Sequence, residues 1–137
     1  MVRREDSITR FNSKTKKSIL VIDDSADLLS LLKTIFEMEG YEVFTGQSGQ
    51  EALKALYTNS YPNLILLDVN LGDIRGPDFL LTLEIQMPKL FNEVAVVFFT
   101  GMDQIPKRKV LDVIRKPIVN SDIFFLSLFL KVAKWVN

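Results

Sequence analysis

The chain has 137 residues, enough for one domain with a sizeable core but too few for two, and 47% of its residues are hydrophobic. Lys plus Arg and Asp plus Glu both number 17, so no net charge points to a nucleic-acid or membrane partner. Histidine and cysteine are both absent, which excludes disulfides, serine–histidine and cysteine–histidine catalytic sites, and zinc sites built on these residues. Any metal site must therefore use oxygen ligands, which favours Mg²⁺ or Mn²⁺, and the lack of cysteine agrees with a reducing cytoplasm.

The N-terminal segment, residues 1–17, contains six basic and two acidic residues and no apolar periodicity. We expect it to be a flexible basic tail. It does not resemble a secretory signal, and no apolar run in the chain reaches the length of a membrane span. These features predict a cytoplasmic protein whose folded domain covers residues 18–137.

From residue 18 onward, short aliphatic runs alternate with segments of helical periodicity. The predicted strands cover residues 18–22, 41–45, 64–67, 94–99 and 110–115. The predicted helices cover residues 26–40, which Ser25 can cap, then 50–57, 77–87 and about 120–136. Five strand–helix repeats with short connections predict an α/β fold with a doubly wound, five-stranded parallel sheet.

Polar side chains follow four of the predicted strands. Asp23 and Asp24 follow the first strand, Asp68 the third, Thr100 the fourth and Lys116 the fifth. Because the carboxyl ends of parallel strands share one edge of a sheet, we expect these groups to converge there. Three neighbouring carboxylates repel one another, so the site needs a divalent cation. One carboxylate could then act as a nucleophile, while the hydroxyl and the ammonium receive a transferred anion. For the first two aspartates alone, the alternative is a solvated acidic turn.

Five segments of the sequence, ILVIDD, GQEAL, LILLDVNLGDIRG, VVFFTG and RKP, carry a family resemblance. Together they resemble the response-regulator receiver domain of two-component signalling, over residues 17–137. The resemblance implies a flavodoxin-like receiver fold in which Asp68 is phosphorylated from a phosphohistidine donor. Thr100 and Lys116 would each contact an oxygen of the phosphoryl group.

The same resemblance implies a metal site. Mg²⁺ (or Mn²⁺) would be bound directly by Asp24, by Asp68 and by the backbone carbonyl of Asn70. Asp23 would act on the ion through a water molecule.

The chain departs from the family pattern in three places. Gly72 and Arg75 stand where the family usually has Pro and Asp, and Val113 replaces an aromatic residue that takes part in switching. Valine is too short and too stiff to turn inward as that ring does. Only fifteen residues separate Thr100 from Lys116, so we expect a shortened fourth helix.

We interpret the chain as a stand-alone receiver, because it ends with the last predicted helix. It would signal by binding a downstream protein or by phosphorelay, with a sensor histidine kinase or a histidine phosphotransfer protein as partner. It would be no enzyme beyond catalysing its own phosphorylation and dephosphorylation. The alternative is a degenerate receiver that acts as a dimerisation or docking module. A phosphatase of the haloacid dehalogenase type is disfavoured, because Asn70 stands where that enzyme needs an acid.

The last predicted helix has more large apolar residues than one buried stripe can use. We expect a stripe of Ile123, Leu126, Leu130 and Ala133. The apolar residues that fall largely outside it are Phe124, Phe125, Leu128, Phe129 and Trp135. They predict a homodimer or a partner complex built on this helix, since exposed apolar patches usually mark interfaces. The alternative is that some of them cover the gap left by the shortened helix.

Overall fold

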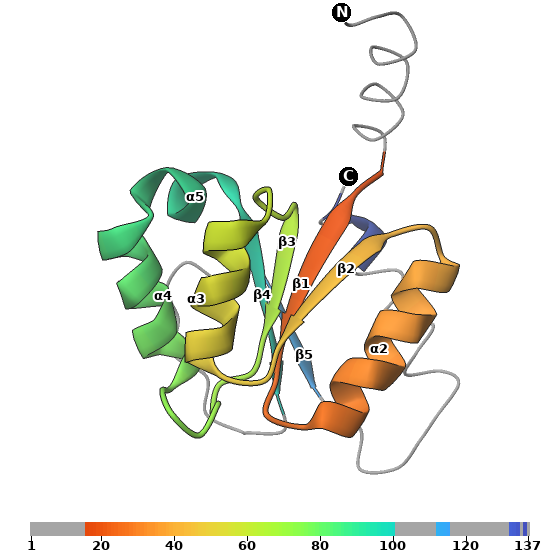
Figure 1. Cartoon of the computed structure of the whole chain (residues 1–137), viewed down its shortest axis with the longest axis horizontal. Helices are drawn as coiled ribbons and strands as arrows, with labels where there is room; N and C mark the ends of the chain where they lie inside the picture. Colours follow the sequence, from red (N-terminus) through yellow and green to blue (C-terminus); the bar gives the residue numbers. More distant parts are fainter. Residues whose placement is uncertain (1–15, 101–111, 116–131, 135, 137) are drawn as a thin grey trace, which may run out of the picture.

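The computed structural model describes residues 16–100, 112–115, 132–134 and 136. Among these residues, parallel strands form one sheet in the order β2-β1-β3-β4-β5 (Figure 1). The strands are β1 (Ser18–Ile22), β2 (Glu42–Gly46), β3 (Leu64–Leu67), β4 (Ala95–Thr100) and β5 (Asp112–Arg115). The predicted α/β fold with a parallel sheet is confirmed. The direction of strand order reverses between β1 and β3, and open α/β sheets bind their ligands at such a point.

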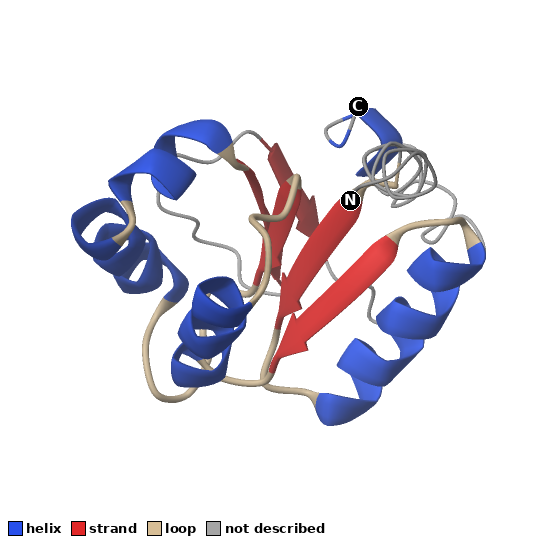
Figure 2. Ribbon diagram, turned by 45° about the horizontal axis from the view of Figure 1, so that its top comes forward, coloured by secondary structure: helices blue, strands red, loops and turns tan. Residues whose placement is uncertain are grey.

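Helices cover both faces of the sheet (Figures 1 and 2). One face carries α2 (Ala26–Met38), and the other carries α3 (Gly49–Thr58), α4 (Gly76–Gln86) and α5 (Pro88–Glu93). Most bounds differ from the predicted ones by no more than one or two residues. None of the helices in the described part of the chain is both long and apolar enough to cross a bilayer.

Alternate residues of the central strands pack into two separate hydrophobic cores, one on each face of the sheet. Ile19 and Val21 of β1 pack with α2 on one face, whereas Leu20 and Ile22 pack with α3 and α4 on the other. All four side chains are buried, as is every residue of β3. This burial on both faces explains why the two strands read as continuous aliphatic runs, and it holds their carboxyl ends in fixed positions.

The segment after α4 differs from the prediction. We expected one helix over residues 77–87 and no further element before the strand at residue 94. Helix α4 does end within one residue of the predicted position, but residues 88–93 form a second helix, α5. Pro88 explains the break between the two helices, because proline lacks an N–H donor and its ring disfavours helical geometry in the residue before it. Met87 has φ −137° and ψ 63°, outside the helical range. Leu90 and Phe91 of α5 are buried and extend the core on that side.

Several expectations fall wholly or largely outside the described residues. These are the basic tail, the shortened helix between residues 101 and 111, and most of the last helix. The described residues at the C-terminus are helical, and Val132 and Val136 are buried in the same core as α2. Ala133, expected in the buried stripe, is half-buried. Among the residues described at this end of the chain, Val132 and Val136 are the buried ones.

Candidate functional site

Three carboxylates gather at the carboxyl edge of the sheet. Asp23, Asp24 and Asp68 each offer a carboxylate oxygen, and these oxygens lie within 4.8 Å of one another. Asp23 and Asp68 are buried and Asp24 is exposed. The strands that position them are direct neighbours, and the Asp68 N–H donates to the Ile22 carbonyl at 3.0 Å. Such a set of oxygen donors suits a hard divalent cation, which would offset the repulsion between the three charges.

The β1–α2 turn is held by its own atoms and by β2. The Asp23 carboxylate accepts a hydrogen bond from the Ser25 N–H at 2.9 Å, and the Asp23 N–H donates to the Gly46 carbonyl at 3.1 Å. Ser25 then caps α2, since its Oγ accepts from the Leu28 N–H at 3.2 Å. The turn therefore points Asp23 inward and leaves Asp24 at the surface.

The β3–α4 loop, residues 70–75, follows Asp68 and Val69. The Asn70 N–H donates to Asp68 Oδ1 at 3.5 Å, and Asn70 Oδ1 accepts from the Gly72 N–H at 3.2 Å. Gly72 has φ +90°, a conformation that glycine adopts readily and that proline, fixed near −65°, does not. The glycine found in place of the family's proline thus fits the path of this loop.

The loop ends in a close backbone contact at Gly76. The Gly76 N–H donates to the Val69 carbonyl at 2.6 Å, and a Cβ added to Gly76 would lie 2.6 Å from the Asp68 carbonyl oxygen and 3.1 Å from the Phe98 ring. Only glycine fits this position, which brings the start of α4 against the end of β3.

The other predicted site residues are placed in part. Thr100 ends β4, the neighbour of β3, and its Cα is in register with that of Arg115 in β5. Val113 lies within β5, in register with Phe98. Lys116 follows β5 and lies outside the described residues, so its predicted approach to the three carboxylates stays a prediction.

The sequence analysis assigned no role to one polar residue near the site, Asp73. The Asp73 carboxylate accepts hydrogen bonds from the backbone N–H groups of Gly49, at 3.0 Å, and Gln50, at 3.2 Å. The bond from Gly49 is the main reason why the pKa of Asp73 lies below its usual value. Its partners precede it by more than twenty residues, so no local pattern signals the contact.

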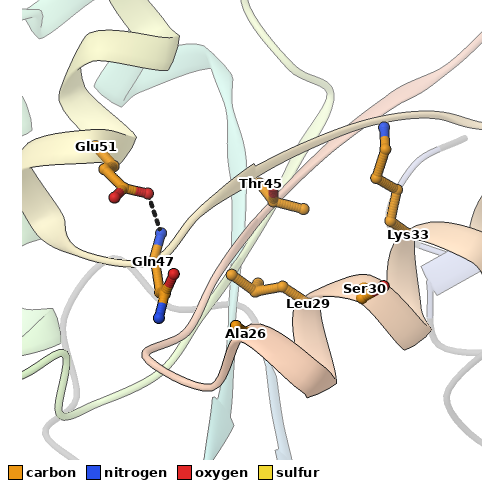
Figure 3. Close-up of a pocket in the computed structure, with 7 residues that line it drawn as sticks. All are labelled: Ala26, Leu29, Ser30, Lys33, Thr45, Gln47 and Glu51. Carbon is orange, nitrogen blue, oxygen red and sulfur yellow. Dashed lines mark hydrogen bonds between the residues drawn. The ribbon is translucent and has the colours of Figure 1, made fainter.

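A polar groove of about 290 Å³ lies beside the β1–α2 turn, between α2, the end of β2 and the start of α3 (Figure 3). Lys33 lines it, but its ammonium group is already bound to Glu37 at 2.8 Å and to the Val43 carbonyl at 3.1 Å. We therefore assign no ligand to this groove.

When the chain is compared with known proteins, one protein family matches most of its length. The model of the response regulator receiver domain matches residues 19–124. The transcriptional regulatory protein PhoP of Bacillus subtilis, named for alkaline phosphatase synthesis, is 45% identical over 60 residues. That match covers 44% of this chain and only 25% of the relative.

Solved structures resemble the chain over most of its length. The response regulator TrrA of Thermotoga maritima, in complex with Mg²⁺ and BeF, is 26% identical, with a TM-score of 0.70. The alignment covers 87% of this chain and 98% of that one. A second structure, the histidine kinase ThkA in complex with TrrA, gives 26% identity and a TM-score of 0.70 over 88% of this chain and 99% of that one.

Proposed function

This chain belongs to the family of response regulator receiver domains, and from that premise we propose that Asp68 takes up a phosphoryl group with the help of Mg²⁺. The observation that carries the proposal is the cluster of three carboxylates at the ends of β1 and β3. We assign the receiver domain to residues 18–137 and a basic tail to residues 1–17.

In the proposed reaction, an oxygen of the Asp68 carboxylate attacks phosphorus in a phosphohistidine or a small phosphodonor. The bond from phosphorus to the donor breaks, and an acyl phosphate forms on Asp68. Water later attacks the phosphorus and restores the carboxylate. Phosphoryl transfer depends mainly on positioning and on cationic charge near the transferred oxygens.

The residues around Asp68 fit this role. Asp23, Asp24 and Asp68, with the backbone carbonyl of Asn70, would hold the cation, which would neutralise charge on the transferred group. Thr100 and Lys116 would contact its oxygens, as the resemblance implies. The side chain of Asn70 already accepts the Gly72 N–H and is no acid, which disfavours a phosphatase of the haloacid dehalogenase type.

The proposed partners are a histidine kinase or a histidine phosphotransfer protein upstream, and a protein target downstream. The complex of ThkA with TrrA supports the kinase. We propose that the chain works by partner binding or by phosphorelay, and that it has no enzymatic activity beyond its own phosphorylation and dephosphorylation.

Intact-mass measurement after incubation with Mg²⁺ and acetyl phosphate or phosphoramidate tests the proposal. We expect a single phosphate adduct that is absent from Asp68→Asn and absent when the metal is chelated. An adduct that survives Asp68→Asn, or no adduct with either donor, would contradict it. The second result would favour the degenerate docking module instead.

A homodimer through the last helix is a separate proposal. Its support is the number of large apolar residues that the sequence places there, together with the burial of Val132 and Val136 against the core that contains α2. Sedimentation at micromolar concentration should give a dimer for wild type and a folded monomer for Phe125→Glu and Phe129→Glu. A monomeric wild type, with both variants unfolded, would assign these rings to the core.

A further inference from the structure

The amino end of α3 is contacted by both of the segments that carry the acidic cluster. From the β3–α4 loop, Asp73 accepts the first two N–H groups of the helix. From the other side, the Gln47 amide just before α3 donates to the Asp24 carbonyl at 3.3 Å. Gln47 is held in turn by its backbone N–H, which donates to Glu51 at 2.9 Å (Figure 3). One helix end thus lies between two segments that are far apart in sequence.

The contact from Asp73 is specific in geometry, although the side chain is exposed. Its two oxygens bind two successive amides, Gly49 to Oδ1 and Gln50 to Oδ2. A carboxylate at this end also interacts favourably with the helix dipole. Two separate bonds fix the direction of the carboxylate as well as its distance from the helix.

An apolar contact accompanies this polar one. A Cβ added to Gly49 would collide with the Ile74 side chain, and Phe79 lies 3.5 Å from the same point. The absence of a side chain at Gly49 therefore lets Ile74 pack directly on the start of α3. Asp73 and Ile74 together dock the β3–α4 loop onto this helix.

The docked part of the loop is joined closely to the candidate metal ligand. The Leu71 N–H donates to the Ile74 carbonyl at 3.1 Å, and Asn70 forms a backbone bridge with Arg75. These contacts close the loop between Asp73 and the backbone of Asn70, which follows Asp68 by two residues, so a displacement at Asp73 would reach that backbone.

Helix α3 does not depend on Asp73 for its cap. The Ser48 Oγ already accepts from the Glu51 N–H at 3.1 Å, and the Ser48 carbonyl accepts from the Ala52 N–H at 3.0 Å. The two bonds to Asp73 are therefore additional to the cap, and they join the β3–α4 loop to the helix.

We propose that Asp73 is a positioning residue for the phosphoryl site. From outside the acidic cluster, it holds the β3–α4 loop so that the Asn70 backbone and Asp68 share one cation. The inference rests on the proposed function. It adds a residue that the family resemblance did not supply.

The proposal is tested by titrating Asp73→Ala with Mg²⁺ and measuring the Kd by calorimetry. Ser48→Ala is the matched control, because it removes a hydrogen bond from the same helix end without releasing the loop. At a temperature where circular dichroism shows all proteins folded, we expect the Mg²⁺ Kd of Asp73→Ala to rise about tenfold, the lower end of the range for removing a group that orients a metal ligand. Ser48→Ala should stay close to wild type. Equal values for Asp73→Ala and Ser48→Ala would overturn the proposal.

Two further measurements separate its failure from that of the proposed function. Hydrogen exchange at the Leu71 amide, without metal, should quicken in Asp73→Ala and not in Ser48→Ala; no difference would refute the anchoring. Asp73→Asn keeps one acceptor oxygen and should restore part of the Mg²⁺ affinity, which a role of charge alone would not. A wild type that binds no Mg²⁺ and forms no adduct would end the proposed function and this inference with it. If wild type binds Mg²⁺ and forms the adduct, and Asp73→Ala binds Mg²⁺ equally well, only this inference is wrong and the proposed function stands.

Discussion

The two connections that carry the acidic cluster are held in different ways. The β1–α2 turn is short, and Asp23 accepts the N–H of a residue only two positions ahead while Ser25 caps the next helix. The β3–α4 loop is longer, contains Gly72 at positive φ, and is docked on α3 by Asp73. One connection is stabilised largely by its neighbours in sequence, the other by a distant helix end.

This difference has a consequence for the site. Local hydrogen bonds form wherever the turn forms, so the position of Asp23 depends mainly on β1, on the start of α2 and on the adjacent end of β2, whose Gly46 carbonyl accepts the Asp23 N–H. The position of Asn70 depends in addition on how α3 packs against the sheet. We therefore expect substitutions in the β3–α4 loop to act on Asp68 from a distance, and those in the β1–α2 turn to act locally.

Among the substitutions that test this difference between the two connections, Gly76→Ala should cause the largest loss of stability. The added Cβ would lie 2.6 Å from the Asp68 carbonyl oxygen, so the strand end or the start of α4 must shift. We expect about 2–3 kcal/mol of lost stability by urea unfolding, typical of overpacking. Gly72→Ala is the control. Nothing lies within 4 Å of a Cβ added to Gly72, so only the positive φ at this position adds strain, about 1 kcal/mol. Equal losses in the two variants would contradict the close contact.

In the short β1–α2 turn, Asp24→Ala should weaken Mg²⁺ binding without lowering the stability of the metal-free protein. The exposed carboxylate is one of three crowded charges, so we expect Mg²⁺ affinity to fall at least about tenfold while the metal-free protein melts at the same or a higher temperature. Asp27→Ala, in the first turn of α2 and outside the cluster, should leave Mg²⁺ affinity unchanged. A clear drop in the melting temperature of metal-free Asp24→Ala would indicate a structural role instead.

Ser25→Ala tests the local character of the short turn. Loss of an N-cap side chain typically removes about 1 kcal/mol of stability, and Ser25→Gly should remove less. Urea unfolding measures both variants. If Ser25→Ala were neutral, the hydrogen bond from the Leu28 N–H to Ser25 Oγ would not contribute to the stability of α2.

The smallest effect concerns the charge of Asp73 and its dependence on pH. Its pKa is lowered in the folded protein, so the carboxylate stabilises the fold at pH values above its unfolded pKa and this contribution is lost as pH falls through the folded value. We expect Asp73→Asn to lose about 0.5 kcal/mol above pH ~5 at low salt, and less below pH ~4. Thermal unfolding across this range measures the difference. A loss that grows in acid would have the wrong sign.

The contrast also explains what could be predicted from the sequence. The aliphatic runs of β1 and β3 gave their bounds without error, because strands buried on both faces leave a continuous apolar pattern. The meeting of Asp23, Asp24 and Asp68 followed from strand topology. The cap at Ser25 followed from local sequence.

Features that depend on distant contacts were not predicted. Asp73 reads as an ordinary loop acid, and its partners in α3 become visible only once the helices are packed on the sheet. Helix α5 was missed for another reason: the predicted helix ended at Met87, within one residue of the end of α4, but the six residues of α5 are too few for their apolar spacing to indicate a helix. The family resemblance helped with neither: Asp73 lies within the quoted motif LILLDVNLGDIRG but was given no role there, and residues 87–93 lie outside the quoted motifs.

Fluorine NMR with beryllofluoride tests the central claim most directly, because this anion mimics a phosphoryl group on a carboxylate. The account predicts a protein-bound ¹⁹F signal that requires Mg²⁺, disappears in Asp68→Asn and weakens in Asp24→Ala. It also predicts that amide signals at Asn70 and Gly72 shift when the anion binds. A bound signal that persists in Asp68→Asn or without Mg²⁺, or no bound signal in wild type, would contradict the claim that these carboxylates form one phosphoryl-accepting metal site.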